Sequence, residues 1–385
     1  MIAGRLPLGW IQLAHQPGRF AMALCGVAAA VTLVFMQLGF MNMIFDTTVM
    51  VHRLLRADLV LVSPSFRDMM STGSIPRRRV VQALGVEGVA DAEALYTATR
   101  DWVKPDGERG TLLLLATRPD FAAFADPVIT AQQHLLAQPG SILLDAGARG
   151  DYRAVLAGLA RGEDWRTEMG GRAITVVGQF RLGSSFGNEG VLIASDETLQ
   201  ALALNRAAAA PNIGLVRLAP GADLRATQAA IAAMLDPADT RVLTHAEFVQ
   251  HTRGYMVRNS PIAVVFGFGL VVGLVVGAMV VTQILTADVQ EHMGEYATFK
   301  AMGFSNRRIL AIVYEQSLLL AVLGSPVGLL CALGLYEMIR VAVAMPITMP
   351  LSRVAIVFGA TFAMCALAGT LATRRARRVD PADVF

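Results

Sequence analysis

Ser185 is the residue whose neighbours most resemble those of a catalytic nucleophile. It is the central serine of G-S-S-F-G at residues 183–187, which fits the pattern G-x-S-x-G. In hydrolases this pattern forms a sharp turn between a strand and a following helix. Here the next segment, residues 190–194, reads as a strand instead. The mismatch favours a hairpin or loop, and a membrane-anchored hydrolase that uses Ser185 is the least favoured hypothesis.

The spacing of the polar residues indicates neither a metal site nor a nucleotide-binding loop. The six histidines are scattered and none forms a ligand spacing with cysteine or carboxylate: His15, His52, His134, His245, His251 and His292. No G-x-x-x-x-G-K-[ST] loop exists, so the chain does not bind ATP in the P-loop manner. Cys25, Cys331 and Cys365 lie in apolar runs, which favours small buried side chains over a disulfide framework. We expect no catalytic residue, no metal and no cofactor in this chain.

Residues 287–308 form a charged, amphipathic interruption between two apolar runs. Helical spacing relates four of its residues: Val289, Met293, Tyr296 and either Phe299 or Lys300. Other faces carry Glu291, His292 and Glu295, and Gly303 can end the helix. A helix that lies on lipid headgroups usually has a mainly basic polar face. The mixture of acid and base favours docking to a protein, with the lipid-surface helix as the alternative.

Four apolar runs indicate a membrane protein. The chain has 385 residues, of which 54% are hydrophobic and 16% charged, against about 25% charged in an ordinary soluble domain. The runs are long enough to cross a bilayer and predict spans at residues 19–45, 261–286, 309–336 and 354–373. The net charge of +3 is too small to indicate nucleic-acid binding.

Two groups of residues inside the predicted spans suggest contacts. Gly269, Gly273 and Gly277 recur every four residues, which allows close approach of another helix, either in this chain or in a second copy. Glu315 and Gln316 lie about two turns into the third span. A polar residue in a membrane helix is a functional candidate, and this depth favours snorkelling or a partner contact over a proton relay.

The distribution of arginine predicts the orientation. Four spans place both termini on one side, and Arg374, Arg375, Arg377 and Arg378 mark that side as cytoplasmic. Residues 1–18 then form a cytoplasmic interfacial elbow helix, residues 374–385 a cytoplasmic tail and residues 337–353 a short periplasmic loop. Arg340 and Arg353 place positive charge in that loop, which argues weakly against this orientation.

Residues 46–260 read as a large mixed α/β domain inserted between the first and second spans. Strand and helix patterns alternate through it, which suggests small α/β units. We expect a flanking subdomain from about 56–120 and 207–245, with a second subdomain, about 121–206, inserted into it. Further strands and helices are expected at 58–62, 76–84, 89–103, 111–117, 141–144, 173–180, 213–218, 223–235, 241–243 and 243–259.

This layout resembles the FtsX/MacB superfamily of ABC-transporter permeases and is closest to its DevC-like permease branch. The sequence E-Y-A-T-F-K-A-M-G at residues 295–303 resembles the superfamily segment E-x-x-x-L-K-A-L-G. Y-E-Q-S at 314–317 and D-P-A at 380–382 also fit. The branch resemblance rests on W-I-Q-L at 10–13, Q-P-G-R-F at 16–20 and F-M-Q-L-G-F at 35–40. The resemblance as a whole covers the sequence at both ends of the chain. For the large domain it is limited to the position of that domain between the first two spans.

The resemblance implies a homodimeric permease subunit in the bacterial inner membrane. A separate ABC ATPase with ATP-Mg would bind the coupling segment: Val289, Glu291, His292, Met293, Glu295, Tyr296, Phe299, Lys300, Met302 and Gly303. A periplasmic membrane-fusion adaptor and an outer-membrane TolC-like channel would complete an export or efflux complex. The permease would transmit ATPase motion to its periplasmic domain, called mechanotransmission. The alternative is an FtsX-like regulatory protein that controls a periplasmic partner, but the large outer domain leans toward transport.

Overall fold

The computed structural model describes residues 17–104, 107–185, 187–202, 210–295, 298, 302, 305–343 and 347–376. Two compact units are present. Of the described residues, the helical unit comprises those up to Asn42, those of Pro261–Ala342 and those from Ile347 onward, and the α/β unit comprises those of Met43–Ser260 together with Val343. Of the predicted elbow helix at 1–18, all but the last two residues lie outside the described part.

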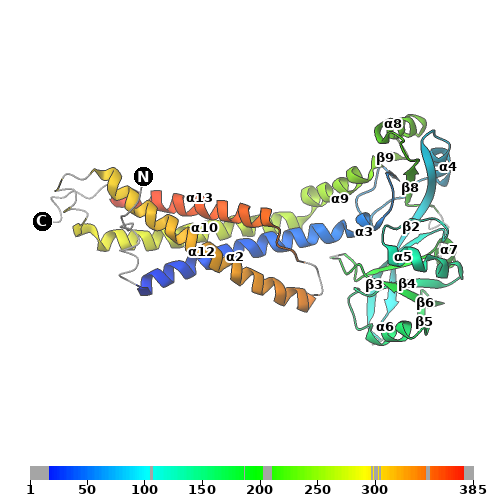
Figure 1. Cartoon of the computed structure of the whole chain (residues 1–385), viewed down its shortest axis with the longest axis horizontal. Coiled ribbons are helices and arrows are strands. Elements are labelled where there is room, and N and C mark those ends of the chain that lie inside the picture. The colour runs from blue at the N-terminus through cyan, green and yellow to red at the C-terminus, as the bar shows by residue number, and fades with distance from the viewer. Residues whose placement is uncertain are drawn as a thin grey trace. The chain divides into compact units, whose positions relative to one another are not determined.

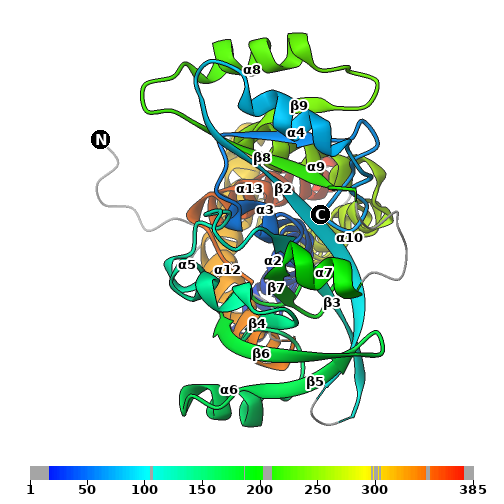
Figure 2. The ribbon, with the colours of Figure 1, turned by 90° about the vertical axis from the view of Figure 1, so that its right-hand side faces the viewer.

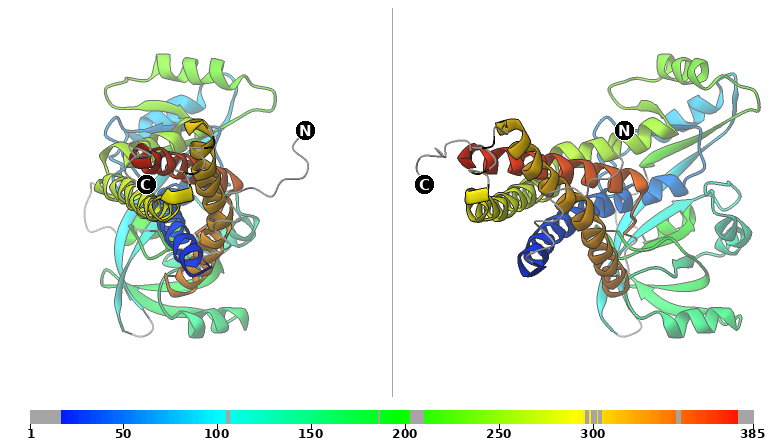
Figure 3. Two further views of the ribbon diagram at one scale, coloured as in Figure 1. Left: turned by 90° about the vertical axis from the view of Figure 1, so that its left-hand side faces the viewer. Right: turned by 60° about the vertical axis from the view of Figure 1, so that its left-hand side comes forward.

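The helical unit contains four long apolar helices that lie side by side (Figures 1 and 3). They are α2 (Pro17–Thr48), α10 (Pro261–Glu291), α12 (Asn306–Val343) and α13 (Leu351–Ala376). Each is long and apolar enough to cross a membrane. In the most apolar window of α10 only 17% of the residues are buried by the protein itself, which is the pattern of a helix that faces lipid. Four spans are therefore confirmed.

The helices run longer than the sequence predicted. α10 continues past residue 286 to Glu291, and α12 begins at Asn306 and continues to Val343, through residues predicted to be loop. At the end of α12 an ion pair runs along the helix: Arg340 donates to both oxygens of Glu337 at 2.6 and 2.9 Å. A pair one turn apart is compatible with helix, and no glycine or proline interrupts the chain between there and Pro346.

The α/β unit is organised around one long strand, β2 (Val89–Val103), which takes part in two sheets (Figure 2). Its first half, through Leu95, pairs with β8 (Ile213–Leu218). Its second half, from Tyr96, pairs with β3 (Arg109–Thr117). The full strand order is β3-β7-β4-β6-β5-β2-β8-β1-β9, with an additional β3–β2 pairing.

The first sheet is antiparallel and covered on both faces. β1 (Leu59–Val62) pairs with β8 and β9 (Arg241–Thr244). Successive side chains of a strand point to opposite faces, so Leu59 and Leu61 enter a core with α4 (Arg77–Leu84) and α8 (Leu224–Met234). Val60 and Val62 enter another core with Phe248 of α9 (His245–Asn259).

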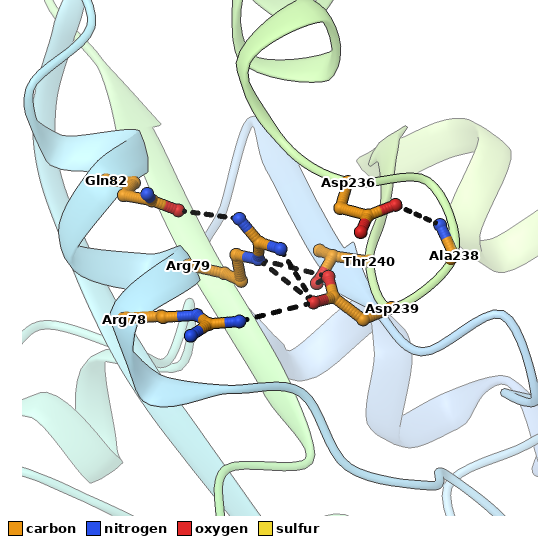
Figure 4. A network of polar contacts seen from close by, with 7 residues as sticks. All are labelled: Arg78, Arg79, Gln82, Asp236, Ala238, Asp239 and Thr240. Carbon is orange, nitrogen blue, oxygen red and sulfur yellow. Dashed lines mark hydrogen bonds and ion pairs between the residues drawn. The ribbon is translucent and has the colours of Figure 1, made fainter.

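An ion-pair network fastens α4 to the segment that precedes β9 (Figure 4). Arg79 donates from Nε to Asp239 Oδ1 at 3.1 Å and from Nη2 to Oδ2 at 2.7 Å, and its Nη1 donates to Gln82. Thr240 Oγ1 donates to the same carboxylate. The hydrogen bonds from Arg79 hold the pKa of Asp239 below its usual range. Arg79 is a buried cation at the start of α4, where the helix dipole disfavours positive charge. The negative charge of Asp239 compensates for this unfavourable position.

The second sheet closes into a ring. In order, β2, β3, β7 (Val191–Ser195), β4 (Ser141–Asp145), β6 (Arg172–Phe180) and β5 (Trp165–Met169) are neighbours, and β5 returns to β2 through a pairing of Trp102 with Met169. β3–β7 and β4–β6 are parallel and the other pairs antiparallel. The predicted subdomain boundary at residue 120 assigned β3 to the flanking part, whereas β3 pairs with β7 and the division by strand pairing falls within β2.

Short elements escaped the sequence prediction. They are α3 (Met50–Leu54), α5 (Pro127–Gln132), the 3₁₀ helix η1 (Gln133–Ala137), α6 (Arg153–Ala160), α7 (Asp196–Leu202) and β5. Asp126 caps α5 by accepting from the Val128 backbone N–H at 2.8 Å.

Candidate coupling site and its helix contacts

The predicted coupling segment begins inside α10 and is not a separate helix from its first residue. Val289 and Glu291 belong to the last turns of α10, and Val289 is buried. A turn follows at His292, after which Met293 and Glu295 are helical again. Met302 is exposed. The remaining predicted contact residues lie outside the described part of the chain: Tyr296, Phe299, Lys300 and Gly303.

Gln316 of α12 contacts the end of α10. Its side chain is fully buried, and Nε2 donates to Oδ2 of Asp288 at 2.8 Å. Asp288 lies one turn before His292, whose Nδ1 is 2.9 Å from the Asp288 carbonyl oxygen and 3.6 Å from its carboxylate. Gln316 thus has a hydrogen-bond partner within the chain. The adjacent Glu315 is half-buried.

A second polar contact joins α10 to α2 at the same end of the helices. Arg19 forms an ion pair with Glu291, and both side chains are about half exposed. An exposed ion pair contributes about 0–1 kcal/mol. The sequence reading selected Glu291 but neither Arg19 nor Asp288 as a contact residue, because partners on different helices leave no local signal.

The three glycines of α10 lie against α2. A Cβ on Gly269 would meet Gln37 at 2.6 Å, and one on Gly273 would meet Leu33 at 3.2 Å. A Cβ on Gly277 would lie 2.7 Å from the Ala30 Cβ and from Met364 Sδ of α13. Helices approach this closely only where a side chain is missing. For these positions the partner is another span of the same chain.

α12 approaches α2 in the same way. A Cβ on Gly324 would lie 2.6 Å from Val27, and one on Gly328 would lie 2.7 Å from Val31. Thr32 Oγ1 donates to the Gly328 carbonyl at 3.1 Å, and Tyr336 Oη donates to the Phe35 carbonyl at 2.5 Å. α2 is therefore in close backbone contact with both α10 and α12.

Three of the six histidines lie near one another in space, which their positions in the sequence did not indicate. In the α/β unit His52 of α3 is buried, with Nε2 2.9 Å from Thr252 Oγ1 of α9. His245 Nε2 lies 2.9 Å from the His52 carbonyl, and His251 Nε2 lies 3.1 Å from the Phe66 carbonyl. Burial foremost, and the nearby His245 and His251 in addition, lower the pKa of His52 to about 3. Within the described residues no His, Cys, Asp or Glu group is arranged to hold a metal.

Ser185 lies outside helix and strand, where the sequence predicted a hairpin or loop. Its backbone N–H donates to the Asn188 carbonyl at 3.0 Å, and its Oγ accepts from the Asn188 N–H at 3.2 Å. The strand β7, not a helix, comes next. A nucleophile elbow requires the helix, so Ser185 does not lie on such an elbow.

The fold and these contacts define a class: a multi-pass membrane protein with a large α/β domain between its first two spans. Residues 267–381 match the family described as FtsX-like permease C-terminal. This match supports the resemblance to the FtsX/MacB superfamily of ABC-transporter permeases over the C-terminal part of the chain, which holds most of α10 and all of α12 and α13.

Two solved structures show a likeness to this chain. The periplasmic region of MacB from Actinobacillus actinomycetemcomitans is 10% identical with a TM-score of 0.35, covering 52% of this chain and 94% of that chain. The extracellular domain of the noncanonic ABC-type transporter YknZ from Gram-positive bacteria is 13% identical with a TM-score of 0.31, covering 49% and 100%. TM-scores this low do not assign a function to the α/β unit. No curated protein matches the sequence.

Proposed function

We propose that this chain is the permease subunit of an ATP-driven tripartite export complex and transmits the motion of a separate ATPase to its α/β domain. The observation that carries the proposal is the family match over residues 267–381, which contains the whole coupling segment. The resemblance to the DevC-like branch extends the proposal to a periplasmic adaptor, an outer-membrane TolC-like channel and a permease homodimer. ATP-Mg would be bound and hydrolysed by the ATPase subunit.

The course of α10 supports a mechanical role. It is a single helix from Pro261 to Glu291, so the span and the start of the coupling segment are one element. The backbone hydrogen bonds of a helix are all internal, and a displacement at its end is therefore carried along its length. The ATPase must supply the bias by binding the permease differently in its two nucleotide states.

Substitution of the predicted contact residues tests the ATPase coupling. Tyr296→Asp and Phe299→Asp should each weaken ATPase binding at least tenfold, because removal of an aromatic anchor typically costs about 2 kcal/mol. The measurements are the dissociation constant and the ATP hydrolysis rate of the purified complex. Val81→Asp, at an exposed apolar position on α4, is the matched control and should change neither. Unaltered binding and hydrolysis in both coupling variants would refute the proposal.

The regulatory alternative differs in what the α/β domain contacts. In an exporter, the purified ATPase–permease complex should bind a membrane-fusion adaptor, and vesicles that contain it should move substrate on ATP addition. A regulatory protein should instead bind a periplasmic enzyme and change its activity without any transport. Adaptor binding measured by surface plasmon resonance, together with a transport assay, separates the two.

A further inference from the structure

The last two turns of α10 carry polar contacts to two other spans. Asp288 accepts the hydrogen bond from Gln316 of α12, and Glu291 pairs with Arg19 of α2. We call the Asp288–Gln316 hydrogen bond and the Arg19–Glu291 ion pair the polar linkage. It lies directly before His292, where α10 ends and the rest of the coupling segment begins. Any displacement of that segment therefore reaches these contacts first.

The Asp288–Gln316 bond lies within an apolar contact. Leu285 and Val289, on either side of Asp288 on α10, are nearly fully buried and share a core with Ile312 and Val313 of α12. Apolar packing is non-directional, so two such helices can slide past each other at modest cost. A hydrogen bond has a narrow range of distance and angle and fixes the register of the two helices.

The two contacts of the polar linkage are unequal in strength. The Arg19 and Glu291 side chains are 53% and 41% exposed, whereas that of Asp288 is 15% exposed and Gln316 is fully buried. A hydrogen bond to a charged group is roughly twice as strong as a neutral one, and a buried amide that loses its partner is penalised by its desolvation. An exposed ion pair contributes little, because water and salt screen it. The contact between α10 and α12 is therefore the firm one.

We propose that Asp288 and Gln316 are positioning residues that make the third span, α12, move together with the coupling segment. The inference rests on the proposed function, since it names the route by which the motion spreads beyond α10. Through this bond a displacement at the end of α10 draws α12 with it. Without the bond, α10 moves and α12 stays behind.

The test follows α10 and α12 separately. In a cysteine-free chain, spin labels are placed at Met279→Cys on α10 or Met338→Cys on α12, both exposed positions. Their spectra are recorded for the complex with its ATPase, with and without a non-hydrolysable ATP analogue. In the otherwise unaltered chain both labels should respond to the nucleotide. In Gln316→Leu the response at 279 should persist and the response at 338 should be lost.

Three further variants separate a positioning role from a merely structural one. Asp288→Asn keeps an acceptor oxygen for Gln316 and should retain both responses. The double variant Asp288→Leu/Gln316→Leu removes both polar partners, which can be nearly neutral for stability, and should fold yet lose the response at 338. Gln283→Leu, the same chemical change at an exposed position of α10 before the coupling segment, should behave as the unaltered chain.

The outcomes distinguish the inference from the function on which it rests. A response at 338 that survives in a folded double variant overturns the role of Asp288 and Gln316. Loss of the response at 338 in Gln283→Leu overturns it as well, because the effect would then be unspecific. If the unaltered complex shows no nucleotide response at 279, the proposed function itself fails.

Discussion

Among single residues, His52 carries the largest electrostatic consequence of its position. It lies in α3 with its ring 4.4 Å from that of Phe248 and its Nε2 bonded to Thr252. A protonated imidazole here would be a cation without water around it, next to His245 and His251. The structure therefore holds His52 neutral, and its pKa is lowered from 6.5 to about 3.

The lowered pKa of His52 predicts a loss of stability in mild acid. Below pH 6.5 the unfolded chain binds a proton at His52, whereas the folded protein, in which the pKa is depressed, does not until the pH approaches 3. The contribution of neutral His52 to the free energy of unfolding is therefore fully present above pH 6.5 and falls as the pH drops toward 3. One pH unit is worth about 1.36 kcal/mol, so the free energy of unfolding should fall by about 2 kcal/mol between pH 6.5 and 5. Denaturant unfolding at a series of pH values measures this.

A pair of variants isolates the His52 contribution. His52→Gln removes the titrating ring, so the pH dependence between 6.5 and 5 should flatten even though the protein is less stable at every pH. His134→Gln, at an exposed position of η1, should retain the full dependence. Equal slopes for His52→Gln and the unaltered chain would contradict the assignment.

At the scale of elements, the helical unit is held together by small residues as much as by large ones. Gly273 and Gly277 of α10 and Gly324 and Gly328 of α12 meet side chains of α2 at distances that leave little or no room for a Cβ. Because lipid is as apolar as a leucine side chain, the association of spans depends on such close van der Waals packing. α2 thereby contacts two other spans along its length.

Enlarging one of these glycines should separate the helices. Gly277→Leu places new atoms where Ala30 of α2 and Met364 of α13 already lie, and overpacking of this kind costs about 1–3 kcal/mol. The melting temperature in detergent should fall. Gly267→Leu is the matched control, since a Cβ at Gly267 meets nothing within 4 Å, and it should melt as the unaltered chain does. Equal melting of the two variants would show that the contact is not needed.

Much of the fold was predictable from the sequence because its elements are apolar. The four spans and most strands follow from hydrophobic runs. β5 was missed because its residues, Trp-Arg-Thr-Glu-Met at 165–169, alternate between more buried side chains and the exposed polar side chains of Arg166 and Glu168. This alternation leaves no apolar run. The Asp288–Gln316 contact was missed because it joins residues 28 positions apart on two helices. Sequence periodicity does not specify the register between helices.

For the whole molecule, the distribution of exposed side chains is that of a membrane protein. α10 exposes Val264, Phe268, Val275 and Met279 among others, a continuous apolar surface larger than a soluble protein tolerates. The α/β unit instead buries its apolar residues in its own cores. The surface of the helical unit therefore suits lipid and that of the α/β unit suits water. The α/β unit must then lie in the aqueous phase on one side of the membrane.

The arginine cluster at residues 374–378 predicts which side that is. If it lies in the cytoplasm, the α/β unit lies outside and the coupling segment inside. In a chain with Cys25, Cys331 and Cys365 replaced by serine, single cysteines are placed at Ala157 of α6 and at Met302, both exposed. A membrane-impermeant maleimide added to cells with a permeabilised outer membrane should label Ala157→Cys and not Met302→Cys. Both should react after the inner membrane is disrupted. Labelling of Met302→Cys alone in intact cells would reverse the orientation and place the coupling segment out of reach of any cytoplasmic ATPase.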